Sequence, residues 1–177
     1  SFYLIGTNGW VDLKRVRRYR LATPGPHLPA LTVTHYGDDY QVALEILPDP
    51  RRDVLLVRFK VEGPYRLAVI LAPHLNSTGR DNRAWLDDGV SFARRGDVTV
   101  SLTANPPLVH LSCGYVGASD GWQDLKRHGR LSYDYSHADS GTVALSGEAQ
   151  GGDGVLALSF AESEFGARTL ARTALAD

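Results

Sequence analysis

The sequence lacks methionine altogether and contains a single cysteine, Cys113. One cysteine excludes an internal disulfide framework. A natural reading frame begins with methionine, whereas this chain begins "SFYLIGTNGW" in a strand-like pattern, so we expect a processed piece or an excerpt of a longer protein. It has no charged start followed by an apolar run, the pattern of a signal peptide. The sequence therefore favours neither a secreted nor a cytoplasmic location.

Charge of one sign and long apolar runs are also scarce. The chain has 19 basic and 20 acidic residues, a net charge of −1. Nucleic-acid binding rests on accumulated lysine and arginine, so no nucleic-acid partner is predicted. The basic run "KRVRRYR" (14–20) alternates with Val16 and Tyr19, which favours a solvated strand face over a binding arm. No stretch approaches the ~20 apolar residues that span a bilayer, so no membrane partner is predicted.

Most of the sequence has the pattern of short strands. Apolar and polar residues alternate, as in Leu131, Tyr133 and Tyr135 against serine and aspartate neighbours. Turn sequences such as "YGDDY", "EGPY" and "RRGD" separate these runs. About ten strands without intervening helices predict antiparallel sheets closed into an all-β sandwich. The expected strands are residues 31–36, 40–47, 53–62, 65–73, 89–95, 98–104, 108–116, 130–136, 142–150 and 154–162.

The last residues change character and predict one short helix. Ser163 is suited to an N-cap and Glu164 to the first turn. Apolar residues then share one face: Ala167, Leu170, Ala171 and Ala174. We expect residues 1–162 to form the sandwich and residues 163–177 to be an exit helix or linker toward a further domain.

Residues 112–131, "SCGYVGASDGWQDLKRHGRL", gather Cys113, Trp122 and two aspartates in one glycine-rich stretch. For zinc, His110, Cys113 and His128 lack the second close ligand pair, so Cys113 is predicted to be buried and unligated. For calcium, Asp87 with Asp88, or Asp120 with Asp124, offer oxygen ligands, but neither pair follows the helix–loop–helix calcium pattern. No cofactor and no metal ligand is therefore predicted, with calcium left as the open alternative.

Enzyme chemistry has weak support in the residues alone. Ser112 with His74, His110 or His128 has no nucleophile-elbow glycine pattern. Paired carboxylates, as in glycoside hydrolysis, are available, but Glu45 and Glu148 sit in strand patterns where exposed carboxylates are routine. No residue is predicted to be catalytic.

Four stretches occur in an order that resembles a known family. They are "PDPRRDVLLVRFKVE" (48–62), "YRLAVILAPHLNSTGRDNRAW" (65–85), "GYVGASDGWQDL" (114–125) and "TVALSGE" (142–148). Together they resemble the N-terminal domain of bacterial and archaeal glucoamylases and glucodextranases, in family 15 of the glycoside hydrolases. The most specific parts are "SDGWQDL" and the stretch that holds His74 and Asn82.

The resemblance implies a galactose-mutarotase-like super-β-sandwich that precedes an (α/α)6 barrel. In that family the barrel carries the two catalytic glutamates of an inverting mechanism, which acts on α-glucosidic bonds of starch, maltooligosaccharides or dextran. This chain has no run of paired helices, so no catalytic residue carries over. The family domain also has strands before the position of Phe2, so the sandwich is expected to be incomplete at its N-terminus.

The expected function is a non-catalytic domain that supports the barrel, its expected partner. The alternatives are a free-standing carbohydrate-binding module that stacks α-glucan rings on Trp10, Trp85 or Trp122, and an enzyme in its own right. For Trp122 three roles stay open: a packed structural corner, a contact with the barrel, or sugar stacking. The candidate carbohydrate or interdomain contacts are Trp122, Asp120, Gln123, Trp85, His74 and Asn82.

Overall fold

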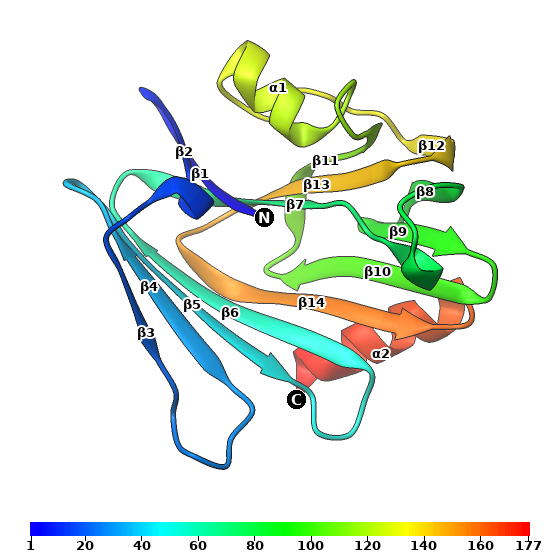
Figure 1. Cartoon of the computed structure of the whole chain (residues 1–177), viewed down its shortest axis with the longest axis horizontal. Coiled ribbons are helices and arrows are strands. Elements are labelled where there is room, and N and C mark those ends of the chain that lie inside the picture. Colours follow the sequence, from blue (N-terminus) through cyan, green and yellow to red (C-terminus); the bar gives the residue numbers. More distant parts are fainter.

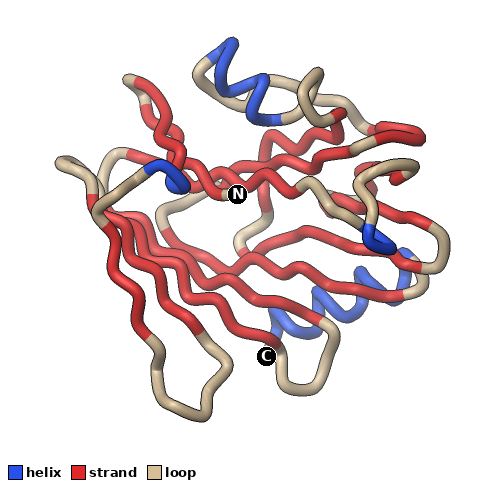
Figure 2. Tube along the Cα trace, viewed as in Figure 1, coloured by secondary structure: helices blue, strands red, loops and turns tan.

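The computed structural model describes residues 1–177 as two antiparallel sheets with two α-helices on their outer faces (Figures 1 and 2). The smaller sheet has the order β11 (Leu108–Tyr115), β13 (Val143–Ala149), β7 (Tyr65–Leu71), β1 (Phe2–Gly6) and β2 (Gly9–Asp12). The larger sheet has the order β12 (His137–Gly141), β8 (Asn82–Asp87), β9 (Val90–Arg95), β10 (Val98–Asn105), β14 (Asp153–Ala161), β6 (Val54–Glu62), β5 (Gln41–Pro48), β4 (Leu31–Tyr36) and β3 (Tyr19–Ala22). The antiparallel sandwich predicted from the sequence is confirmed.

The main core lies between the sheets. It contains 22 buried residues, among them Leu4 of β1, Val42 of β5, Phe59 of β6 and Leu145 of β13. Strand alternation explains this arrangement, because every second side chain of a strand points to the same face. The opposite face of each sheet is free to carry a helix.

Helix α2 (Glu164–Ala176) covers part of the outer face of the larger sheet (Figure 1). The Ser163 side chain caps it by accepting a hydrogen bond from the Gly166 amide at 3.1 Å. Ala167 and Ala171 are fully buried against the sheet, because small side chains let the helix approach the strands closely. The C-terminal helix and its buried face were both predicted correctly.

Two local predictions were wrong. Residues 131–136 form no strand and run as an extended coil between α1 (Gly121–His128) and β12 (Figure 2). In the basic run, a 3-10 helix spans Leu13–Arg15, and the strand β3 starts only at Tyr19. Helix α1 itself lies in the glycine-rich stretch 112–131, for which no helix was predicted, and a second 3-10 helix spans Leu75–Ser77. None of the helices combines the length and the apolarity that crossing a membrane requires.

The larger sheet extends beyond the smaller one, and its inner face is exposed there. Leu21, Val33 and Leu44 lie opposite one another on β3, β4 and β5, so they share one face. Leu44 is 3% exposed inside the core, whereas Leu21 is 56% exposed at the edge of the sheet. The apolar surface over β3 and β4 is thus the part of the sandwich that the smaller sheet does not cover.

Candidate functional site

Helix α1 lies on the outer face of the smaller sheet, and Asp120 fixes its start. The Asp120 carboxylate is buried and accepts hydrogen bonds from the backbone amides of Trp122, at 2.8 Å, and Gln123, at 3.0 Å. It also accepts a bond from the Gly117 amide, which folds the preceding loop onto the same side chain. Asp120 is therefore an N-cap that joins loop and helix into one rigid unit.

One helical turn later, Asp124 holds the segment that follows α1. Its carboxylate, in a residue only 1% exposed, accepts hydrogen bonds from the Ser132 amide at 2.6 Å, the Ser132 hydroxyl at 2.7 Å and the Tyr133 amide at 2.7 Å. His128 Nδ1 lies 2.7 Å from the same carboxylate. Burial opposes ionisation of Asp124, but these hydrogen bonds outweigh it and hold its pKa below the ordinary value.

The extended coil 131–136 is tied to the smaller sheet at further points. The Tyr135 amide donates to the Ser112 hydroxyl at 3.1 Å, and the Tyr135 carbonyl accepts from the Cys113 amide at 2.8 Å. Leu131 is buried beneath the helix. Because several backbone amides and carbonyls of this coil are hydrogen-bonded, its exposed side chains are held in defined positions.

Trp122 packs at the edge of this helix–sheet contact. It is partly buried against a cluster of seven buried residues: Tyr3, Ile5, Ala68, Ile70, Leu125, Leu131 and Ala144. The Lys126 ammonium lies 5.2 Å from the centre of the indole, a distance typical of a cation–π contact. Trp122 therefore anchors α1 and leaves part of its ring, with the half-buried Gln123, at the surface.

We expect Trp122→Ala to lower the free energy of unfolding by about 2 kcal/mol. The loss is less than for a core tryptophan because only part of the Trp122 ring is buried in an apolar contact. Urea unfolding of the chain measures this change. Trp10→Ala is the matched comparison, since Trp10 packs at the edge of the same cluster on β2. A change below about 0.5 kcal/mol for Trp122→Ala would mean that the indole anchors nothing within the chain.

The other candidate contacts do not join Trp122. Trp85 lies on the outer face of the larger sheet, stacked on Phe92 with ring centroids 5.5 Å apart. Its Nε1 donates to Glu164 at 3.0 Å and so connects β8 to the start of α2. Asn82 is fully buried and donates to two backbone carbonyls of the β7–β8 connection, whereas His74 is exposed in that connection. The predicted contact residues therefore lie on both sheets and do not form one site.

Cys113 is buried in the main core, as predicted. Burial raises the pKa of its thiol to about 12. No three histidine, cysteine, aspartate or glutamate side chains are grouped where they could hold a metal ion. The candidate calcium ligands have other partners, since Asp87 pairs with Arg168 and Asp88 pairs with Arg172 at 2.7 Å.

Cys113 is expected to resist thiol reagents in the folded chain, because a buried thiol of such a high pKa provides almost no thiolate near neutral pH. A colorimetric disulfide reagent should label it only in denaturant, at a rate that follows unfolding. Rapid labelling of the native chain at neutral pH would contradict the buried placement.

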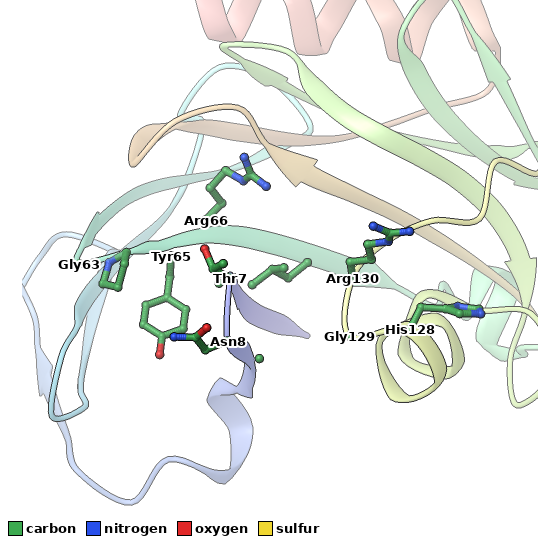
Figure 3. A pocket seen from close by; sticks show the side chains of 12 residues that line it. Thr7, Asn8, Gly63, Tyr65, Arg66, His128, Gly129 and Arg130 are labelled. Atoms are coloured by element: carbon green, nitrogen blue, oxygen red, sulfur yellow. The ribbon is translucent and has the colours of Figure 1, made fainter.

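A polar cavity of ≈ 720 Å³ opens beside the C-terminal end of α1. Arg66, Thr7 and Asn8 line one side and Arg130 the other, and the His128 ring points away from the β1–β2 hairpin (Figure 3). Arg66 also pairs with the buried Glu148, with Nε and Oε1 2.5 Å apart. Glu148 thus has a local cationic partner and is buried, whereas the strand pattern led us to expect an exposed carboxylate.

Comparison with known proteins assigns the family. The family model described as "Glucodextranase, domain N" matches residues 2–177. The chain belongs to this family. No curated protein matches its sequence.

A solved structure has the same fold as this N domain. It is a bacterial glucoamylase complexed with acarbose, with a TM-score of 0.92 at 20% sequence identity. The match covers 99% of this chain and 28% of that one, so the N domain spans less than a third of the glucoamylase it matches. A family 92 α-mannosidase from Bacteroides thetaiotaomicron aligns over 81% of this chain and 19% of its own, with 9% identity and a TM-score of only 0.34.

Sequence reasoning missed the roles of Tyr133 and Tyr135, which it placed in a half-buried strand. In the N domain both belong to the coil that Asp124 holds, and the Tyr135 side chain is exposed. A sequence signal was present, because Asp120 and Gly129 bracket "GWQDLKRH" as an N-cap and a left-handed C-cap bracket a short helix.

Proposed function

We propose that this N domain is the non-catalytic part of a glucoamylase-type enzyme that hydrolyses α-glucosidic bonds, and that it supports an (α/α)6 catalytic domain in the same polypeptide. The match to the glucodextranase N-domain model over residues 2–177 carries the proposal. The glucoamylase that shares the fold devotes 28% of its chain to this part, which leaves room there for a separate catalytic unit.

The acidic side chains of the N domain support a structural role. Glycoside hydrolysis needs an acid and a base facing a cleft. Asp120 is used in capping α1, Asp124 in holding the coil 131–136, and Glu148 in pairing with Arg66. Each buried carboxylate thus has a structural partner of its own.

Two measurements test the proposal. The isolated chain should release no glucose from starch, dextran or aryl α-glucosides. In the full-length protein, removal of the N domain should lower the thermal midpoint of the remaining catalytic domain. Glucose release by the isolated chain would refute the non-catalytic role. A reading frame without any catalytic domain would refute the supporting role.

A further inference from the structure

Three rings gather beside α1 in a group that we call the tyrosine row: His128, Tyr133 and Tyr135. The centroids of Tyr133 and Tyr135 lie 5.3 Å apart, and those of His128 and Tyr133 lie 5.5 Å apart. The row is open to solvent, because Tyr135 is 46% exposed and the His128 side chain 44%. Large aromatic surface is costly to leave in water, at about 25 cal/mol per Å² of apolar area. Its exposure at one place therefore calls for an explanation.

The row is held in place more firmly than exposed side chains usually are. Asp124 fixes His128 Nδ1 on one side and the Tyr133 amide on the other. Arg127 donates to the Tyr133 hydroxyl at 3.0 Å, and the Tyr135 backbone is bonded in both directions to β11. A ligand that stacks on these rings meets side chains that are already ordered. Preorganisation of this kind lowers the entropic cost of binding.

The chemistry of the row fits a neutral ligand with one apolar face. The nearby cations have contacts of their own: Arg127 donates to the Tyr133 hydroxyl, Lys126 lies over the Trp122 ring, and Arg130 lines the polar cavity. A pyranose ring presents C–H bonds on one face and hydroxyl groups at its edge. Aromatic rings suit the face, and the exposed polar residues that follow Tyr135 in the chain, Ser136 and His137, offer hydrogen-bonding groups for the edge.

The angles between the rings bear on the shape of the ligand. Tyr133 and Tyr135 are inclined by 50°, and His128 and Tyr133 by 78°. A flat, extended chain of sugars needs rings in nearly one plane, whereas an α-linked glucan coils and turns successive sugars relative to one another. The inclined rings match the curved chain.

We propose that the tyrosine row is a binding surface for the pyranose rings of an α-glucan. This inference rests on the proposed function, because it takes the sugar class from the enzyme type to which the N domain belongs. Tyr133 and Tyr135 form the centre of this surface. Trp85 takes no part in it, because its ring is stacked on Phe92 within the domain.

Calorimetric titration of the chain with maltoheptaose tests the proposal. We expect saturable binding that Tyr135→Ala weakens at least about fivefold, because stacking is lost with the ring. Tyr135→Phe keeps the ring and should retain most of the affinity. Tyr19→Ala is the matched control, since Tyr19 is 55% exposed on β3 and far from the row in the sheet order. Tyr135 is exposed, so unfolding curves should show both alanine variants folded.

Several outcomes would overturn the inference. One is the absence of any binding at about 10 mM maltoheptaose. Another is an affinity that Tyr135→Ala leaves unchanged. A third is a Tyr135→Ala variant that lowers the thermal midpoint of the full-length enzyme and has no effect on glucan binding, which would make the row a contact with the catalytic domain. None of these results touches the supporting role, which is tested by removal of the N domain and by the glucose-release assay.

Discussion

Asp124→Ala is expected to lower the free energy of unfolding of the N domain by about 4 kcal/mol, among the largest effects of any single change in α1. The carboxylate is 1% exposed and accepts hydrogen bonds from Ser132 and Tyr133. Hydrogen bonds to a charged group contribute about 1.5–3 kcal/mol each, and their loss leaves partly buried amides without an acceptor. Urea unfolding gives the total change. Hydrogen exchange at the Ser132 and Tyr133 amides should show the local loosening.

The contribution of Asp124 depends on pH in a defined direction. Its pKa is lowered in the folded chain, so the unfolded chain binds more protons. The stabilisation is therefore fully present above the unfolded pKa, about 4, and is lost as the pH falls through the folded value. The difference in stability between the parent chain and Asp124→Ala should accordingly shrink below about pH 4.

Asp134→Ala is the control for this prediction. Asp134 lies on the same coil, is exposed, and has no hydrogen-bond partner or ion pair in the structure. Its replacement should change stability by less than about 0.5 kcal/mol. Equal effects of the two alanine variants would mean that the coil is not held through the Asp124 carboxylate.

Much of the sandwich was predictable because the sequence signals for its strands and turns lie within short segments. Each strand shows an alternation between neighbouring positions, and turn residues mark its ends. Both signals can be recognised without knowledge of the partner strand. The face of α2 that carries Ala167 and Ala171 was predictable for the same reason. A helical period appears within a few residues, whatever the helix packs against.

The candidate site was less predictable because side chains bind backbone amides there, and backbone amides are the same at every position. The amides of Ser132 and Tyr133 carry no sequence signal that identifies Asp124 as their acceptor. Alternation predicted one buried face for Leu131, Tyr133 and Tyr135, but Leu131 is buried and Tyr135 is exposed. What the pattern could not show is that side-chain acceptors, Asp124 and Ser112, replace a neighbouring strand for these amides.

Gly114→Ala is expected to lower the free energy of unfolding by about 3 kcal/mol or more, through a clash and not through the loss of a contact. Strand β11 passes beneath the loop that leads into α1. A Cβ atom on Gly114 would lie 2.0 Å from the Ser119 carbonyl oxygen and 2.9 Å from the Asp120 amide nitrogen. Both neighbours are backbone atoms, and they belong to the turn that Asp120 fixes, so the loop cannot yield without the loss of its cap.

Two other glycines separate the clash from ordinary glycine effects. Gly117 has a φ of +81° with open space around its Cβ position, so Gly117→Ala should cost only the strain of that conformation, about 1 kcal/mol. Gly151 has neither a close neighbour nor such a φ, and Gly151→Ala should be nearly neutral. Thermal and urea unfolding of the three variants should rank them in that order. If Gly114→Ala proved as mild as Gly117→Ala, the loop would be free to lift from β11, and α1 with the tyrosine row would not be fixed to the sheet.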